Sequence, residues 1–205
     1  GIFAALKKNK WQDHFISTIV MIFVSVPSFV YAFLLQYFLG FKWGLFPITV
    51  SSLVDAGNSW FSPIMMKSMV LPVLALSFGT IAGLTRFTRA ELTETLTCDY
   101  MLLARTKGLT KGQAVVHHAL KNAMVPILPT IISSFISVLA GSMIIEGIFA
   151  VPGIGSLYIK AVSNLDYDVF MGCNVFYIFI GLAAAIVVDL SYGFIDPRIR
   201  MGASK

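Results

Sequence analysis

The chain has 205 residues, of which 57% are hydrophobic and only 12% are charged, and its mean hydropathy is +0.83. Soluble domains average about 25% charged residues. The composition therefore excludes an ordinary globular enzyme and indicates a membrane protein that crosses the bilayer several times.

Four stretches are long and apolar enough to span a bilayer, which takes about 17–25 mostly apolar residues. The first is a run of 24 residues without a charge, and the second is the shortest. We therefore expect an all-α fold with four transmembrane helices and a single domain over residues 1–205. The predicted spans are Ile16–Leu39, Ser68–Thr85, Val125–Ile145 and Val169–Val188.

The segment before the first span starts with the apolar run Gly1–Leu6 and continues into the basic run Lys7–Lys10. This pattern is typical of the inner end of a helix. We therefore expect the chain to be incomplete at its N-terminus.

The second span contains Gly79 and Gly83, a GxxxG pair. Small residues one turn apart allow membrane helices to pack closely. The favoured interpretation is packing within this chain, and the alternative is an interface with a second membrane subunit.

The segment from Arg86 to about residue 124 is charged but patterned as helices. Asp99 is predicted to be the N-cap of a short helix, and Arg105 and Lys107 fall near its end, where cations are favoured. Gly108 then suits the left-handed position after the helix. A capping box, Thr110 with Gln113, starts a second helix that should continue into the third span. The sequence thus predicts helix, glycine turn, helix.

The segment between the third and fourth spans contains Pro152-Gly153-Ile154-Gly155, which predicts a turn or a re-entrant bend. Glu146, at the end of the third predicted span, is expected near the membrane interface.

Basic residues give the orientation. Twelve of the 15 lie on one side of the predicted spans, and Lys42, Lys67 and Lys160 lie on the other. Because lysine and arginine in short loops stay in the cytoplasm, both chain ends are expected inside. This asymmetry accounts for the net charge of +5, so we expect no nucleic-acid partner.

The segment Asp99–Leu109, followed by His118–Ala123, closely resembles the cytoplasmic EAA loop of ABC-importer permeases, especially their peptide and nickel branch. Gly108 occupies the family's glycine position and Ala104 its second alanine position. Leu102 and Leu103 replace the family's Glu and first Ala, and Lys121 replaces its Pro.

The resemblance extends over nearly the whole chain. Further matching pieces are residues 8–13, Pro27-Ser28, residues 86–90 with Glu94, residues 152–155 and Asp196-Pro197-Arg198-Ile199-Arg200.

The resemblance implies a type I importer fold that normally has six spans, with a cytoplasmic coupling loop over residues 86–124. It implies import of oligopeptides or dipeptides across the bacterial cytoplasmic membrane by alternating access. The implied partners are a second homologous permease, two cytoplasmic ATP-binding subunits, an extracytoplasmic solute-binding protein and membrane lipid. The implied coupling residues are Asp99, Tyr100, Ala104, Arg105, Lys107, Gly108, Leu109, His118, Leu120 and Asn122.

Other functions remain open. Import of nickel or another small solute is the nearest alternative, and a membrane scaffold or membrane enzyme is a remote one. No Gly-x-x-x-x-Gly-Lys-Ser/Thr phosphate loop occurs in the sequence, so ATP hydrolysis is expected in a partner. We expect no enzymatic activity, cofactor or metal in this chain.

Overall fold

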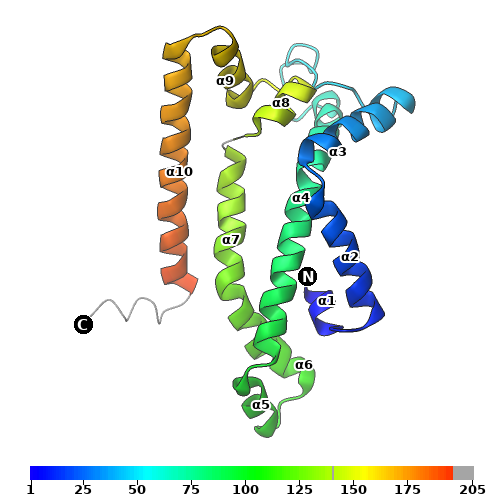
Figure 1. Ribbon diagram of the computed structural model, residues 1–205, viewed down its shortest axis with the longest axis vertical. Coiled ribbons are helices and arrows are strands. Elements are labelled where there is room, and N and C mark those ends of the chain that lie inside the picture. The colour runs from blue at the N-terminus through cyan, green and yellow to red at the C-terminus, as the bar shows by residue number, and fades with distance from the viewer. Residues whose placement is uncertain (140, 196–205) are drawn as a thin grey trace, which may run out of the picture. The chain divides into compact units, whose positions relative to one another are not determined.

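A computed structural model of the protein describes residues 1–139 and 141–195. The predicted motif at residues 196–200 lies outside the described residues. The described residues form helices and no strands (Figure 1), as the all-α prediction requires. The helices are α1 (Ile2–Leu6), α2 (Trp11–Ser25), α3 (Ser28–Leu35), the π-helix η1 (Gln36–Lys42), α4 (Pro63–Leu96), α5 (Asp99–Thr106), α6 (Lys111–Ala114), the π-helix η2 (Val115–Leu120), α7 (Lys121–Leu139), α8 (Met143–Phe149), α9 (Ile154–Ser163) and α10 (Tyr167–Ile195).

The helices divide into two compact units that alternate along the sequence. The first unit contains residues 1–22 and 82–137 and the described residues from 181 onward. The second contains residues 23–81 and the described part of 138–180. The first unit holds the predicted helix–glycine–helix segment, and the second holds both places where the chain departs from a simple span.

Within residues 1–139 and 141–195, three unbroken helices are long and apolar enough to cross a membrane: Pro63–Leu96, Lys111–Leu139 and Tyr167–Ile195. The second and fourth predicted spans lie inside two of them. Helix α4 continues 11 residues past Thr85 because residues 86–96 contain no proline or glycine. Hydropathy thus marks where the apolar part of this helix ends and not where the helix ends.

The first predicted span is broken into two helices at its proline. Helices α2 and α3 meet at 92° across Val26-Pro27. Proline has no N–H and disfavours helical conformation in the residue before it. The carbonyl of Phe23, which a non-proline residue 27 would have bonded, instead accepts a hydrogen bond from the Tyr31 hydroxyl at 3.2 Å. A side chain thus satisfies the backbone group that the break frees.

The third predicted span ends earlier than expected, at Leu139. Gly141 has φ +69° and Ser142 is extended, so the helix cannot continue to Ile145. Helix α8 begins instead and meets α9 at 90°. The predicted bend at residues 152–155 is therefore confirmed.

The buried side chain of Glu146 stabilises this bend by hydrogen bonds. Only 8% of it is exposed. One carboxylate oxygen accepts the N–H of Ser142 at 3.1 Å, and the other accepts the N–H of Ser156 in the first turn of α9 at 3.0 Å. A negative charge is favourable at that end of a helix. Glu146 therefore connects α8 to the start of α9.

Three glycines make room for this carboxylate, Gly141 before α8 and two in the Pro-Gly-x-Gly motif. A Cβ added at Gly153 would collide with Glu146, and one added at Gly155 would lie 2.7 Å from the Met143 Cα and 2.9 Å from a Glu146 oxygen. The packing of α9 against α8 therefore depends on the glycines of the Pro-Gly-x-Gly motif. The turn also joins the second unit's core, since the Phe149 carbonyl accepts the N–H of Val50 at 2.8 Å.

We predict that Gly155→Ala destabilises the protein by about 1–3 kcal/mol, the usual cost of overpacking a tight contact. Gly147→Ala is the matched control, because a Cβ at Gly147 meets no atom within 4 Å. Thermal unfolding of the purified protein in detergent measures both. An equal unfolding midpoint for the two variants would show that the α8–α9 contact is not tight.

Candidate functional site

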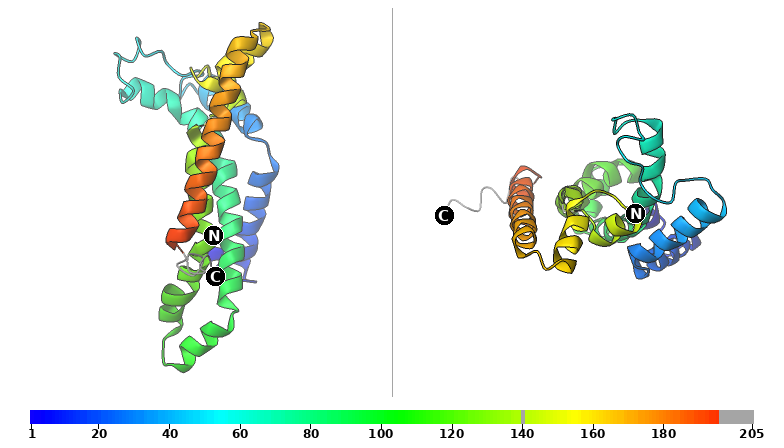
Figure 2. Two further views of the ribbon diagram at one scale, coloured as in Figure 1. Left: turned by 90° about the vertical axis from the view of Figure 1, so that its left-hand side faces the viewer. Right: turned by 90° about the horizontal axis from the view of Figure 1, so that it is seen from above.

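The predicted coupling segment is a helical hairpin in the first unit. It leaves α4 at Leu96, forms α5, turns at Gly108 and returns through α6 into η2 and α7. The hairpin is drawn in green in the two side views (Figure 1, Figure 2). Its helix–glycine–helix order is the one that the sequence predicts.

Helix α5 begins one residue earlier than the sequence predicts. Asp99 is the first helical residue, and the N-cap is Cys98, whose backbone is extended and whose side chain makes no capping hydrogen bond. The prediction that Asp99 is the N-cap is therefore wrong by one position. Its carboxylate still lies in the first turn, where a negative charge favours the helix.

The turn after α5 is a Schellman motif, and it confirms the prediction for Gly108. The Gly108 N–H donates to the Arg105 carbonyl at 3.0 Å, and the Leu109 N–H donates to the Ala104 carbonyl at 3.2 Å. Gly108 has φ +86°, a conformation that costs a residue with a Cβ about 1–2 kcal/mol. Leu109 packs against the hydrophobic core, as this motif usually requires.

The start of α6 confirms the predicted capping box. The Gln113 N–H donates to the Thr110 hydroxyl oxygen at 3.3 Å, and the Thr110 N–H donates to the Gln113 side-chain oxygen at 3.0 Å. From there the chain stays helical through residues 111–139. The turn at Gly108 is thus followed by a continuous helix that reaches the third predicted span, although Pro126 and Pro129 inside α7 donate no backbone hydrogen bond.

The inner side of the hairpin is packed with small residues. Ala104 is 4% exposed, and Ala114, Ala119 and Ala123 are fully buried. They form one cluster with Leu92 at the end of α4 and Ile127 in α7. Ala104 therefore gives close packing within the chain, and its side chain is not on the outer face of the hairpin.

The outer side of α5 carries exposed apolar and basic groups. Leu102 is 66% exposed and Leu103 is 56% exposed, and Arg105 and Lys107 are also exposed. Apolar residues next to cations on a short surface helix are typical of a contact for another protein. The two leucines are not among the predicted coupling residues, because in the sequence they appear only as departures from the family pattern. Their helical spacing from the buried Met101 and Ala104 could have revealed them.

Tyr100 and Asn122, both predicted site residues, lie close to each other. The Tyr100 hydroxyl is buried beside Asn122 and Cys98, and no hydrogen bond of standard geometry joins it to any described residue. This burial raises the pKa of Tyr100. Leu120 packs against the core cluster, and His118 lies in the π-helix η2, partly buried.

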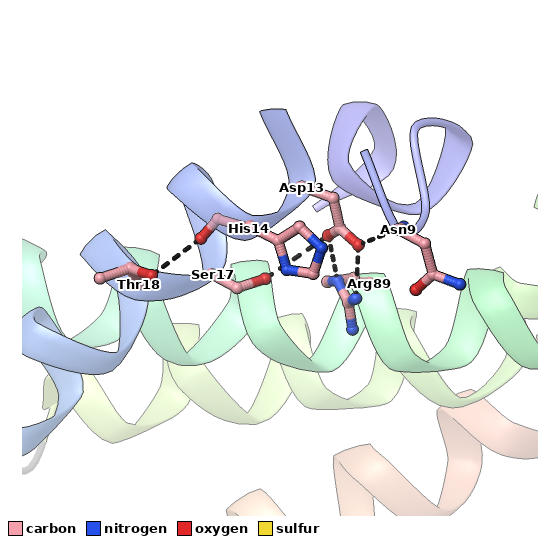
Figure 3. A network of polar contacts seen from close by, with 6 residues as sticks. All are labelled: Asn9, Asp13, His14, Ser17, Thr18 and Arg89. Atoms are coloured by element: carbon pink, nitrogen blue, oxygen red, sulfur yellow. Dashed lines mark hydrogen bonds and ion pairs between the residues drawn. The ribbon is translucent and has the colours of Figure 1, made fainter. Parts of the chain in front are cut away.

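A bidentate ion pair fixes the start of α2 to α4 in the same unit. Arg89 Nε and Nη2 donate to the two carboxylate oxygens of Asp13 at 2.5 and 2.6 Å (Figure 3). Asp13 is fully buried, and the Arg89 side chain is 32% exposed. The Asn9 N–H also donates to the carboxylate, at 3.0 Å. The sequence suggests the importance of both segments but not that they meet.

The glycine pair of α4 lies on an open face. A Cβ at Gly79 or at Gly83 would meet no described atom within 4 Å. No helix among the described residues therefore packs onto either glycine, and their packing role stays a prediction.

Comparison with known proteins agrees with the family resemblance seen in the sequence. Residues 1–201 match the family described as binding-protein-dependent transport system inner membrane component. The chain is 38% identical over 201 residues to the dipeptide transport system permease protein DppB of Bacillus subtilis, covering 98% of this chain and 61% of that protein. It is 36% identical over 200 residues to the oligopeptide transport system permease protein OppB of Salmonella typhimurium, covering 98% and 62%. The chain thus spans about three fifths of the length of these relatives.

We predict that Gly108→Ala destabilises the α5–α6 turn by about 1 kcal/mol, because alanine must adopt the left-handed conformation. Gly112→Ala should be neutral or stabilising, since Gly112 is helical and open space surrounds it. Amide hydrogen exchange over residues 99–115 reports the difference. Faster exchange in the Gly112 variant than in the Gly108 variant would contradict the assigned turn.

Proposed function

The chain belongs to the family of binding-protein-dependent transport system inner membrane components, and from this premise we propose that it is the transmembrane permease part of an ABC importer for peptides. The substrate class follows from the relatives, whose names specify dipeptide and oligopeptide transport.

The chain is a multi-pass component of the bacterial inner membrane. Its family is defined by that location, and its helices fit it. In the apolar part of α10, only 6% of the residues are buried within the protein. So much exposed apolar surface is stable only against lipid or other transmembrane helices.

The α5–Gly108–α6 hairpin is the observation that carries the proposed mechanism. Its outer face presents Leu102, Leu103 and Arg105 to a partner. Its inner face packs tightly against the ends of α4 and α7. When a partner ATPase moves this outer face, the packed alanines transmit the displacement to two membrane helices, because a close-packed contact moves as a rigid body.

The proposed partners are those that the family resemblance implies. Two cytoplasmic ATP-binding subunits drive the movement, and a second homologous permease forms the pathway together with this chain. An extracytoplasmic binding protein delivers the peptide. The open glycine face at Gly79 and Gly83 is available to one of the remaining helices of the permease pair. No covalent bond of the substrate is broken in this chain.

The hairpin lies on the cytoplasmic side in this proposal, with both ends of the chain inside. The supporting observation is the distribution of the basic residues, since Arg86, Arg105, Lys107, Lys111 and Lys121 all lie in the segment between the second and third spans.

Charge reversal on the outer face tests the coupling role. We expect Arg105→Glu in the assembled transporter to reduce peptide uptake and retention of the ATPase subunit at least about tenfold, since a like-charge contact costs more than 1.4 kcal/mol. Val116→Ser is the control, because Val116 is 59% exposed on η2 and lies outside α5. Uptake of labelled dipeptide and co-purification measure both effects.

Normal uptake by Arg105→Glu with the ATPase retained would refute the coupling role. Uptake of Ni²⁺ without uptake of peptide would assign the substrate to the nickel branch instead.

Cysteine labelling tests the orientation. In a variant with Cys98 and Cys173 replaced by serine, Val54→Cys lies on a predicted outside segment where Val54 is 80% exposed. Thr106→Cys lies at the end of α5. A membrane-impermeant maleimide should label Val54→Cys in intact cells and Thr106→Cys only after lysis. The opposite order would invert the topology.

A further inference from the structure

A small cavity lies between α2 and α4 in the first unit and plays no part in the proposed coupling. Its volume is about 200 Å³. Its lining residues are the apolar Ile16, Val20 and Met21 and the polar or basic His14, Ser17, Thr85, Arg86 and Arg89. The cavity is thus apolar on one part of its lining and polar or basic on the rest.

The cavity lies where both helices change from apolar to charged sequence. Ile16 is the first residue of the uncharged run of 24 in the first predicted span. Thr85 is the last residue of the second predicted span, and Arg86 follows it. Two neighbouring helices therefore leave the hydrocarbon at this cavity, which puts its polar part at the depth of the lipid head groups.

The two arginines at the cavity differ, because only one of them forms an ion pair with a described residue. Arg89 is occupied by Asp13, with two hydrogen bonds and an ion pair. Arg86 is exposed and makes no ion pair with any residue that the structure describes. One guanidinium thus lines the cavity without a counter-charge among the described residues, together with the Thr85 hydroxyl. The Ser17 hydroxyl also lines the cavity but donates to Asp13 at 3.4 Å.

We propose that this cavity binds the phosphate of a membrane phospholipid, with Arg86 as its principal ligand. A guanidinium and the Thr85 hydroxyl are suitable donors to a phosphate, and the apolar residues Ile16 and Val20 accommodate the first segment of an acyl chain. A basic pocket between membrane helices on the basic side of a bilayer is a setting in which lipid head groups bind.

Two other occupants fit less well. Free inorganic phosphate leaves Ile16 and Val20 without a contact. An acidic protein segment would have to lie at the hydrocarbon boundary, where its backbone polar groups lack partners. The inference rests on the membrane insertion of the chain and on its proposed orientation, and it is independent of its substrate and coupling.

The test compares lipid retention in full-length permease assembled with its partners. Wild-type and variant complexes are exchanged into mild detergent with phosphatidylglycerol, phosphatidylethanolamine or diacylglycerol of identical chains, and bound lipid is counted by native mass spectrometry. We expect Arg86→Gln to bind phosphatidylglycerol about fivefold more weakly, the loss expected for one cation near an anionic head group. Arg86→Lys should retain most of the affinity.

Lys121→Gln is the matched control. It removes one positive charge at the start of α7, away from the cavity lining, and should bind as the wild type does. Should Arg86→Gln fail to assemble, Thr85→Val removes a lining hydroxyl at nearly constant volume and should weaken binding in the same direction.

Four results would overturn the proposal. These are unchanged binding in Arg86→Gln, equal losses in Arg86→Gln and Lys121→Gln, equal binding of diacylglycerol and phosphatidylglycerol, and displacement of the lipid by millimolar inorganic phosphate. The last would identify a free-phosphate site. All readouts are lipid counts, so a failure of peptide transport leaves the test intact.

Discussion

A bilayer supplies no hydrogen-bonding partners, so a helix that breaks near it must find partners within the protein. Each break among the described residues meets this requirement in a different way. The Tyr31 hydroxyl replaces the missing proline N–H at the break between α2 and α3. Glu146 accepts the backbone N–H of Ser142, just before α8, and that of Ser156, at the start of α9. The α5–α6 turn uses a Schellman motif and a capping box. The bends of this chain are therefore fixed by specific bonds.

The lack of polar partners in the bilayer also explains how the charged residues near it are paired. The buried carboxylate of Asp13 is paired with Arg89 and hydrogen-bonded by a backbone N–H, since a buried charge needs full compensation. Arg86, three residues earlier on the same helix, has no such partner. Two arginines one helical turn apart therefore have different tasks. Arg89 fixes the fold, and Arg86 is available to a ligand.

The sequence predicted the parts of the fold that depend on local chemistry. Gly108, the Thr110 capping box and the bend at residues 152–155 were predicted correctly. At these positions the residue type itself indicates the backbone conformation or the capping hydrogen bond. Long-range pairs were not found. Asp13 with Arg89 and Glu146 with Ser156 join residues whose proximity depends on tertiary packing. Hydropathy also missed the breaks at Pro27 and Gly141, because an apolar run looks the same whether the helix inside it is straight or bent.

The nearly unburied surface of α10 has a consequence for biogenesis. A helix whose apolar residues contact so little of its own chain is selected for membrane insertion by lipid partitioning and not by tertiary packing, so it can be established in the bilayer before the rest of the domain folds. Polar substitutions along it should then act in two separable steps, first on insertion and later on association with neighbouring helices. Substitutions in this helix should therefore act on insertion and assembly, whereas in the proposed mechanism substitutions in the α5–α6 hairpin act on coupling.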